Sequence, residues 1–150
     1  MTLRVLVAIV VLAAVPGTRA ATAQPRVVEV AASLHVLIRF DDGTVVAMGE
    51  NRAGQLGRPP GIREFFPVQR VDLPRKATQI ATGGDSSFAL LEDGTVWAWG
   101  RGYEGQLGVA IEGIARWTPM PVPGIANARF ITAERNEAMA VLQDGTVRAW

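Results

Sequence analysis

The sequence predicts an all-β repeat fold, a partial β-propeller, and three observations lead to that class. Sixteen glycines and nine prolines in 150 residues favour many turns and short strands over long helices. Two different tetrapeptides recur along the chain at one fixed spacing. Short apolar segments flank one of these tetrapeptides, as the two strands of a hairpin do.

An internal repeat of 51 residues is the strongest of these signals. The tetrapeptide Asp-Gly-Thr-Val occupies 42–45, 93–96 and 144–147, and Gly-Gln-Leu-Gly occupies 54–57 and 105–108. Because two independent motifs share one period, the spacing indicates a repeated supersecondary unit rather than coincidence.

Each repeat is predicted to contain a tight antiparallel hairpin. In the second repeat the apolar segment 86–91 and the segment 95–99, rich in β-forming residues, flank Asp93-Gly94. Asp-Gly indicates a two-residue primed turn, because glycine adopts a positive φ without a Cβ clash. We therefore expect this turn at every Asp-Gly pair.

The two strands of the hairpin are expected to be buried in a pattern typical of stacked sheets. Both alternating faces of 86–91 are apolar, so this strand requires cover on both sides. In the second strand Val96 and Ala98 share an unchanging, closely packed face, Trp99 packs on the other face, and Trp97 lies near solvent. Small sheets that are covered on both faces and repeat at a fixed period are the blades of a propeller.

Residues 1–23 have the layout of a secretory signal peptide. A short basic start precedes eleven apolar residues, and small residues follow a Pro-Gly break. The apolar segment is shorter than the roughly 20 helical residues of a membrane span; an uncleaved anchor or a buried core helix is the alternative. We expect cleavage after Ala23 or, as a second choice, after Ala20. The expected organisation is a signal peptide at 1–23 and a partial propeller at 24–150, with units at about 27–77, 78–128 and 129–150.

Composition and charge exclude several function classes. The chain has no cysteine and one histidine, which excludes disulfides, thiolate chemistry and zinc sites built from several histidines. Removal of 1–23 leaves thirteen basic and fourteen acidic residues, a formal charge of −1, which argues against nucleic acid as a partner. No triad, carboxylate pair or phosphate-binding loop is discernible. We therefore expect no catalytic, cofactor or metal site, no small-molecule substrate, and no membrane contact after signal cleavage.

The second unit resembles the regulator-of-chromosome-condensation repeat. The resemblance rests on Ile-Ala-Thr-Gly at 80–83, Asp-Gly-Thr-Val-Trp-Ala-Trp-Gly at 93–100 and Gly-Gln-Leu-Gly at 105–108, and it extends over about 27–150. It implies a seven-bladed propeller with repeats of about fifty residues, of which about two and a half blades are present. We expect the chain to be the N-terminal part of a longer protein; the alternative is a ring closed by several copies.

Some positions of the family pattern are occupied differently in this chain. The histidine that the family commonly has seven residues before Asp-Gly is His35 in the first unit, followed by Ser86 and Glu137. The glycine expected three residues earlier is, in the same order, Ala32, Gly83 and Glu134. We interpret His35 as a structural residue at a strand edge rather than a ligand or a catalytic group. Asp41-Asp42-Gly43 is interpreted as a turn rather than a cation site.

These features predict a secreted, non-catalytic scaffold, periplasmic or extracellular, that binds another protein through its loop face. The segments 58–77 and 109–128 are expected to be variable loops on rigid hairpins, and such loops carry recognition. The candidate contact residues are basic or aromatic: Arg52, Arg58, Arg63, Phe65 and Tyr103. The family resemblance implies two alternatives, guanine-nucleotide exchange on a small GTPase and inhibition of a secreted enzyme such as a β-lactamase. An enzymatic domain further along a longer protein is a third.

Overall fold

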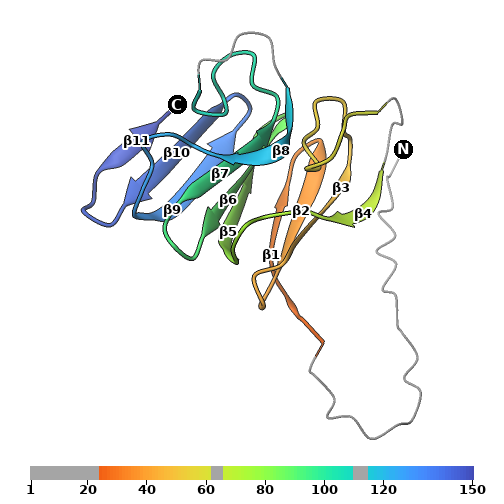
Figure 1. Ribbon diagram of the computed structural model, residues 1–150, viewed down its shortest axis with the longest axis horizontal. Helices are drawn as coiled ribbons and strands as arrows, with labels where there is room; N and C mark the ends of the chain where they lie inside the picture. The colour runs from red at the N-terminus through yellow and green to blue at the C-terminus, as the bar shows by residue number, and fades with distance from the viewer. Residues whose placement is uncertain (1–23, 62–65, 110–114) are drawn as a thin grey trace, which may run out of the picture.

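The computed structural model describes residues 24–61, 66–109 and 115–150 (Figure 1). Eleven strands, joined by turns and short connections, make up this part of the chain. Within these ranges there is no helix that is long and apolar enough to cross a membrane. Arg63 and Phe65, two of the predicted contact residues, and the predicted signal peptide at 1–23 lie outside the described residues.

The strands form three antiparallel sheets, which we call blades 1, 2 and 3. Blade 1 contains β1 (Val27–Ala32), β2 (His35–Phe40), β3 (Val45–Gly49) and β4 (Phe66–Arg70). Blade 2 contains β5 (Ala77–Thr82), β6 (Ser86–Leu91), β7 (Val96–Gly100) and β8 (Arg116–Pro121). Blade 3 contains β9 (Ala128–Glu134), β10 (Glu137–Leu142) and β11 (Val147–Ala149). In every blade the spatial order of the strands follows the order in the chain, and the predicted all-β class is confirmed.

The blades stand side by side, and their first strands β1, β5 and β9 are neighbours (Figure 1). Polar side chains join these strands across the gap between sheets. Glu29 accepts a hydrogen bond from the backbone N–H of Ile80 at 3.2 Å. At the corresponding register position of blade 2, Gln79 donates to the carbonyl of Ile131 at 2.9 Å and accepts from its N–H at 2.8 Å. One position of the repeat thus aligns each blade with the next.

Blade 2 is buried on both faces, as the sequence predicts. Every residue of β6 is buried. Ala89, Leu91 and Trp99 belong to a hydrophobic cluster shared with blade 1, whereas Phe88 and Leu90 belong to a second cluster shared with blade 3. Trp99 is 0% exposed, which confirms it as a core residue.

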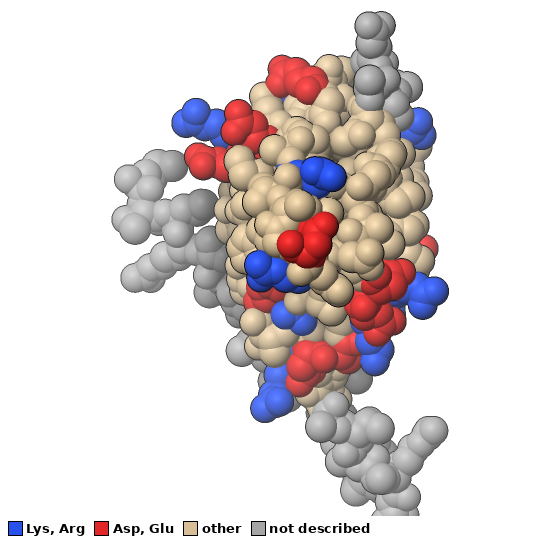
Figure 2. All heavy atoms as spheres, turned by 90° about the vertical axis from the view of Figure 1, so that its left-hand side faces the viewer, with Lys and Arg blue, Asp and Glu red and all other residues tan. Residues whose placement is uncertain are grey.

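Burial of the repeated valine-alanine face depends on the presence of a neighbouring blade. Val96 and Ala98 are fully buried against blade 3. Their equivalents Val147 and Ala149 are exposed on the outer face of blade 3, where Figure 2 shows acidic and basic side chains interspersed over an otherwise uncharged surface. Trp97, predicted near solvent, is half-buried because it packs against the cluster between blades 1 and 2.

The Asp-Gly turns are three-residue loops, so the predicted two-residue primed turn is wrong. In blade 2 the N–H of Gly94 donates to the carbonyl of Leu91 at 2.9 Å, and the N–H of Leu91 donates to the carbonyl of Thr95 at 2.9 Å; the other two turns repeat these bonds. A primed turn of type I′ needs positive φ at two residues, but here Gly94 (φ 78°) has it and Asp93 does not. Asp93 instead accepts hydrogen bonds from the hydroxyl of Thr95 at 2.6 Å and from its N–H at 3.1 Å. Both bonds lower the pKa of Asp93, and the bond from the Thr95 hydroxyl contributes more than the bond from the backbone N–H.

The predicted loops 58–77 and 109–128 each contain the outer strand of a blade, β4 and β8 respectively. Both strands hold prolines, such as Pro67 in β4 and Pro119 in β8. Proline cannot donate a hydrogen bond within a sheet and is confined to edge strands, where one side of the strand is unpaired. The connections that remain after each outer strand, 71–76 and 122–127, lead directly to the next blade.

Candidate interaction surface

The two ends of the blades differ, and we name them the loop face and the turn face. The loop face carries the Gly-Gln-Leu-Gly loops and the turns between the first two strands of each blade: 50–61, 101–109, 33–34, 83–85 and 135–136. The turn face carries the Asp-Gly turns and the connections between blades: 41–44, 92–95, 143–146, 71–76 and 122–127. Because β2 runs from one end of the sheet to the other, the two faces lie at opposite ends of the strands.

Buried amides fix the first loop of the loop face. The Asn51 side chain is fully buried and accepts from the N–H of Leu56 at 3.0 Å. Its amide group donates to the carbonyls of Arg58 at 3.3 Å and Pro59 at 2.9 Å. Gln55 is also 0% exposed, and its Oε1 accepts from the backbone N–H of Ala53 at 2.9 Å. Since buried polar groups are costly unless hydrogen-bonded, these bonds hold the loop in a single conformation.

The same loop is bonded to blade 2 at the backbone carbonyl of Gln55. This carbonyl accepts from the Ser87 hydroxyl at 2.8 Å and from the indole N–H of Trp99 at 2.9 Å. The Nε2 atom of His35 lies 2.6 Å from the Ser87 oxygen. The loop of blade 1 is therefore part of the junction between the two blades.

His35 is a structural residue in this arrangement, although it lies close to a serine. Ser87 gives its single proton to the Gln55 carbonyl, so Nε2 of His35 must be the donor in the bond between the two residues. A histidine that donates to the hydroxyl cannot act as its general base. His35 and Ser87 are 1% and 0% exposed, and burial lowers the pKa of His35 to about 4 against an opposing hydrogen bond at Gly84. His35 is the first residue of β2, an inner strand.

Equivalent turns of the loop face are joined from blade to blade. The Ser33 hydroxyl donates to the carbonyl of Gly84 at 3.2 Å, and the N–H of Gly84 donates to the carbonyl of Arg135 at 2.8 Å. These three residues occupy the same position in consecutive repeats. The loop face is therefore one continuous, hydrogen-bonded surface across the three blades.

The structure places the predicted contact residues in two separate groups. In the first loop Arg52 is exposed, while the Arg58 guanidinium lies 4.8 Å from the ring centroid of Phe66 and stacks on it. In the second loop Tyr103 is 54% exposed, and the Arg101 guanidinium lies 5.8 Å from the centre of its ring. No hydrogen bond or ion pair between described residues joins the two groups.

A charged network around Tyr103 is the feature that the sequence analysis missed. Arg101 contacts Glu104 at 3.3 Å and Asp85 at 3.9 Å. Glu104 in turn accepts a hydrogen bond from the side chain of Asn136, which belongs to blade 3. These residues come from three turns of the loop face. The sequence does contain one indication of this network. Arg101-Gly102 occupies the positions that Glu50-Asn51 has in the first loop, and Glu50 to Arg101 is the one reversal of charge between the two loops.

Two family models, both describing the same repeat, match this chain. Residues 42–90 and 93–134 match the family "Regulator of chromosome condensation (RCC1) repeat", and a second model of the same repeat matches 77–106. The regulator of chromosome condensation of Drosophila melanogaster is 39% identical over 101 residues, which are 64% of this chain and 18% of that protein. The human probable E3 ubiquitin-protein ligase HERC6 is 29% identical over 119 residues, which are 77% of this chain and 12% of that protein.

Solved structures share the arrangement of the blades. Human WBSCR16 superposes with a TM-score of 0.77 at 28% identity, over 85% of this chain and 34% of that one. Yeast RCC1 (Prp20), solved bound to Kap60, has a TM-score of 0.68 at 24% identity, over 84% of this chain and 30% of that one. The chain therefore spans about a third of these structures and less than a fifth of the fly relative. Its repeats, its stacked blades and these matches make the chain a member of the RCC1 repeat family with the fold of a partial β-propeller.

Proposed function

We propose that the chain is a non-catalytic scaffold that binds another protein through its loop face, outside the cytoplasm. The observation that carries the proposal is the group around Tyr103. The exposed ring of Tyr103 lies 5.8 Å from the guanidinium of Arg101, which pairs with Glu104 on the same loop. Tyrosine and arginine, together with tryptophan, are enriched at the energetic centres of protein interfaces.

The anchoring of this loop supports recognition, because a rigid contact surface loses little conformational entropy on binding. Gln106 is 1% exposed and accepts from the N–H of Glu104 at 2.8 Å. The backbone carbonyl of Gln106 accepts from the indole N–H of Trp150 at 2.9 Å, which ties the loop to blade 3. The related yeast RCC1 was solved in complex with Kap60, so blades of this type occur in proteins that bind other proteins.

The proposed location rests on the layout of residues 1–23. A direct test is expression of the full chain in a secreting host, followed by N-terminal sequencing of the exported protein. The proposal expects a mature terminus at Gln24, or at Ala21 for the second cleavage choice. An uncleaved chain that stays in the cytoplasm would overturn the proposed location.

Site-specific photo-crosslinking tests the loop face itself. A photoreactive residue at position 103 is expected to give one discrete covalent adduct with a protein of the same compartment. The same residue at position 147, which is exposed on blade 3, should not form this adduct. Arg101→Glu should abolish the adduct, and Arg148→Glu, a charge reversal outside the loop face, should leave it. Equal adducts from both positions, or an adduct that survives Arg101→Glu, would contradict the proposal.

Guanine-nucleotide exchange is tested by incubating the chain with small GTPases loaded with fluorescent GDP. The proposal expects nucleotide release at the intrinsic rate. Release that is accelerated by the chain and lost in Arg101→Glu would assign exchange to the loop face instead.

A further inference from the structure

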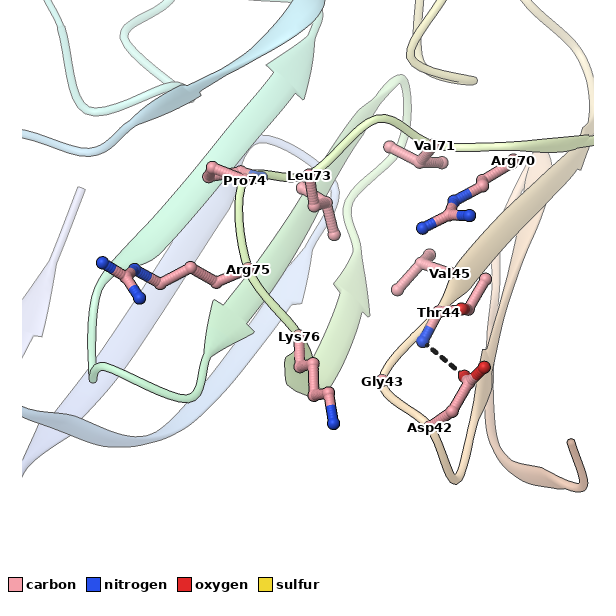
Figure 3. A pocket seen from close by; sticks show the side chains of 10 residues that line it. All are labelled: Asp42, Gly43, Thr44, Val45, Arg70, Val71, Leu73, Pro74, Arg75 and Lys76. Atoms are coloured by element: carbon pink, nitrogen blue, oxygen red, sulfur yellow. Dashed lines mark hydrogen bonds between the residues drawn. The ribbon is translucent and has the colours of Figure 1, made fainter.

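A pocket of about 440 Å³ opens on the turn face at the junction of blades 1 and 2. One wall is the Asp-Gly turn of blade 1, and the other is the connection 71–76 that leads to blade 2 (Figure 3). The backbone shapes both walls, since the N–H of Val71 donates to the carbonyl of Val45 at 2.9 Å and that of Ala77 to Gly43 at 3.0 Å. The pocket is therefore a fixed feature of the junction and lies far from the loop face.

Three cations and one carboxylate line this pocket. Arg75 points away from it and forms an ion pair with Asp93 at 2.9 Å (Figure 3). Arg70 directs its guanidinium into the space between the two walls, and Lys76 stands on the opposite wall beside Gly43 (Figure 3). Among the described residues, neither Arg70 nor Lys76 has an ion-pair partner.

Asp42 is the single acidic residue of the lining, and it is already engaged. Its Oδ1 atom accepts from the backbone N–H of Thr44 at 2.8 Å, the same bond that closes the other Asp-Gly turns. The carboxylate is therefore held in the turn, and it forms no ion pair with the two lining cations in the described structure. The lining keeps an excess of positive charge.

The blade architecture does not require these cations. The repeat places a second junction between blades 2 and 3, with the same backbone bonds from Val122 to Val96 and from Ala128 to Gly94. At the positions of Arg70, Arg75 and Lys76, that junction has Pro121, Ala126 and Asn127. The positive charge belongs to one junction of the chain and not to the repeat.

We propose that this pocket binds an anionic ligand through carboxylate or phosphate groups, with Arg70 on one wall and Lys76 on the other. Arginine is suited to such groups because its planar guanidinium donates two parallel hydrogen bonds to a carboxylate or a phosphate. In Figure 3 the Lys76 ammonium points away from the Arg70 guanidinium, so a ligand with two or more anionic groups is expected to contact both cations by drawing the exposed Lys76 side chain towards it. The site is separate from the loop face, so it does not depend on the proposed function.

Titration with small anions, followed by ¹H–¹⁵N NMR of the purified chain at constant ionic strength, tests the proposal. The four probes are acetate, citrate, inorganic phosphate and pyrophosphate. Saturable shifts are expected at Thr44, Arg70 and Lys76, with citrate or pyrophosphate binding more tightly than the corresponding simple anion. Saturation by citrate but not pyrophosphate identifies a carboxylate ligand, and the reverse identifies a phosphate ligand; each supports the site.

Neutral substitutions assign the binding to the two cations. Arg70→Gln and Lys76→Gln are expected to weaken the tightest probe about fivefold each, while Arg148→Gln, an exposed cation on blade 3, leaves the affinity unchanged. The spectra of the variants without probe report whether each remains folded. The proposal is overturned if no probe gives saturable shifts, or if all three variants bind as the wild-type chain does.

Discussion

The indole N–H of Trp99 donates a hydrogen bond of 2.9 Å to the backbone carbonyl of Gln55, 44 residues earlier in the chain. Trp150 makes the same 2.9 Å bond to Gln106, again across 44 residues. In both cases a tryptophan at the end of one blade's inner hairpin holds the Gly-Gln-Leu-Gly loop of the preceding blade. The loop face is thus built by contacts between blades, and stability and presentation of the loops are linked.

Trp99→Ala is expected to destabilise the chain by about 3–5 kcal/mol, because it opens a cavity in the cluster between blades 1 and 2. Trp99→Phe keeps most of the packing and removes the indole donor, so the expected loss is smaller, about 1–2 kcal/mol. Urea unfolding monitored by circular dichroism measures both. Trp117→Ala is the matched control, since Trp117 is 45% exposed, and it should change stability by less than about 1 kcal/mol. A Trp99→Ala midpoint equal to that of the wild type would show that this position is outside the core.

Stability is expected to fall as the pH decreases from about 6.5 to about 4 because of His35. Its pKa is about 4 in the folded chain and near 6.5 when unfolded. As the pH falls, the unfolded chain therefore takes up the proton before the folded chain does. The contribution of neutral His35 to the free energy of unfolding is complete above pH 6.5 and is lost as the pH falls towards 4. The loss over this window is about 3 kcal/mol. Urea unfolding at stepped pH should show this slope in the wild type and a reduced slope in His35→Gln. Parallel slopes would contradict the assignment.

Alanine substitutions at two equivalent turn glycines, Gly94 and Gly145, distinguish the cost of backbone strain from the cost of a clash with the next blade. A Cβ atom at Gly94 would lie 3.0 Å from the Cα of Asn127, whereas one at Gly145 would meet nothing within 4 Å. Both residues have positive φ, 78° and 86°. Gly145→Ala should therefore cost about 1 kcal/mol through φ alone, and Gly94→Ala should cost more. Thermal unfolding of both variants checks the order, and equal losses would mean that the turn does not abut the next blade.

The two loop glutamines are expected to differ in the same assay. Gln55 uses both ends of its amide, since Nε2 donates to Asp85 at 3.0 Å and Oε1 accepts from Ala53. The Nε2 atom of Gln106 is buried without a partner among the described residues. Because an unpaired buried donor is itself unfavourable, Gln106→Ala should destabilise by about 1 kcal/mol less than Gln55→Ala. Equal losses would contradict this difference.

The sequence predicts the centre of each blade better than its edges. The 51-residue period, the burial of both faces of β6 and the core role of Trp99 follow from motif spacing and alternation, and the structure confirms them. The outer strands β4 and β8 lie within the segments 58–77 and 109–128, which the sequence predicts as variable loops, and both strands contain prolines. An edge strand tolerates proline because it leaves one side unpaired, and that is a property of the assembled sheet.

The candidate surface was predicted in part, for a related reason. Arg52 and Tyr103 are candidates because they are basic or aromatic loop residues, and both are exposed. Arg58 instead stacks on Phe66 in the outer strand of the same blade, and Arg101 contacts Asp85 and Glu104, which binds Asn136 of blade 3. The first contact depends on how the loop folds back on its own sheet and the second on how the sheets stack, and neither is encoded in local patterns of the sequence. The turn type was missed because the Asp93 side chain, rather than a second positive φ, closes the turn.

Hydrogen–deuterium exchange of the full chain tests the stacking of blades most directly. Sandwiching of blade 2 predicts that the amides of β6 exchange most slowly, because both faces of this strand are covered. The amides of β10, the equivalent inner strand of blade 3, should exchange faster, because β10 alternates between exposed and buried residues and lies in a sheet that is covered on one face by blade 2. Equal exchange in β6 and β10 would show that coverage of the second face does not protect blade 2.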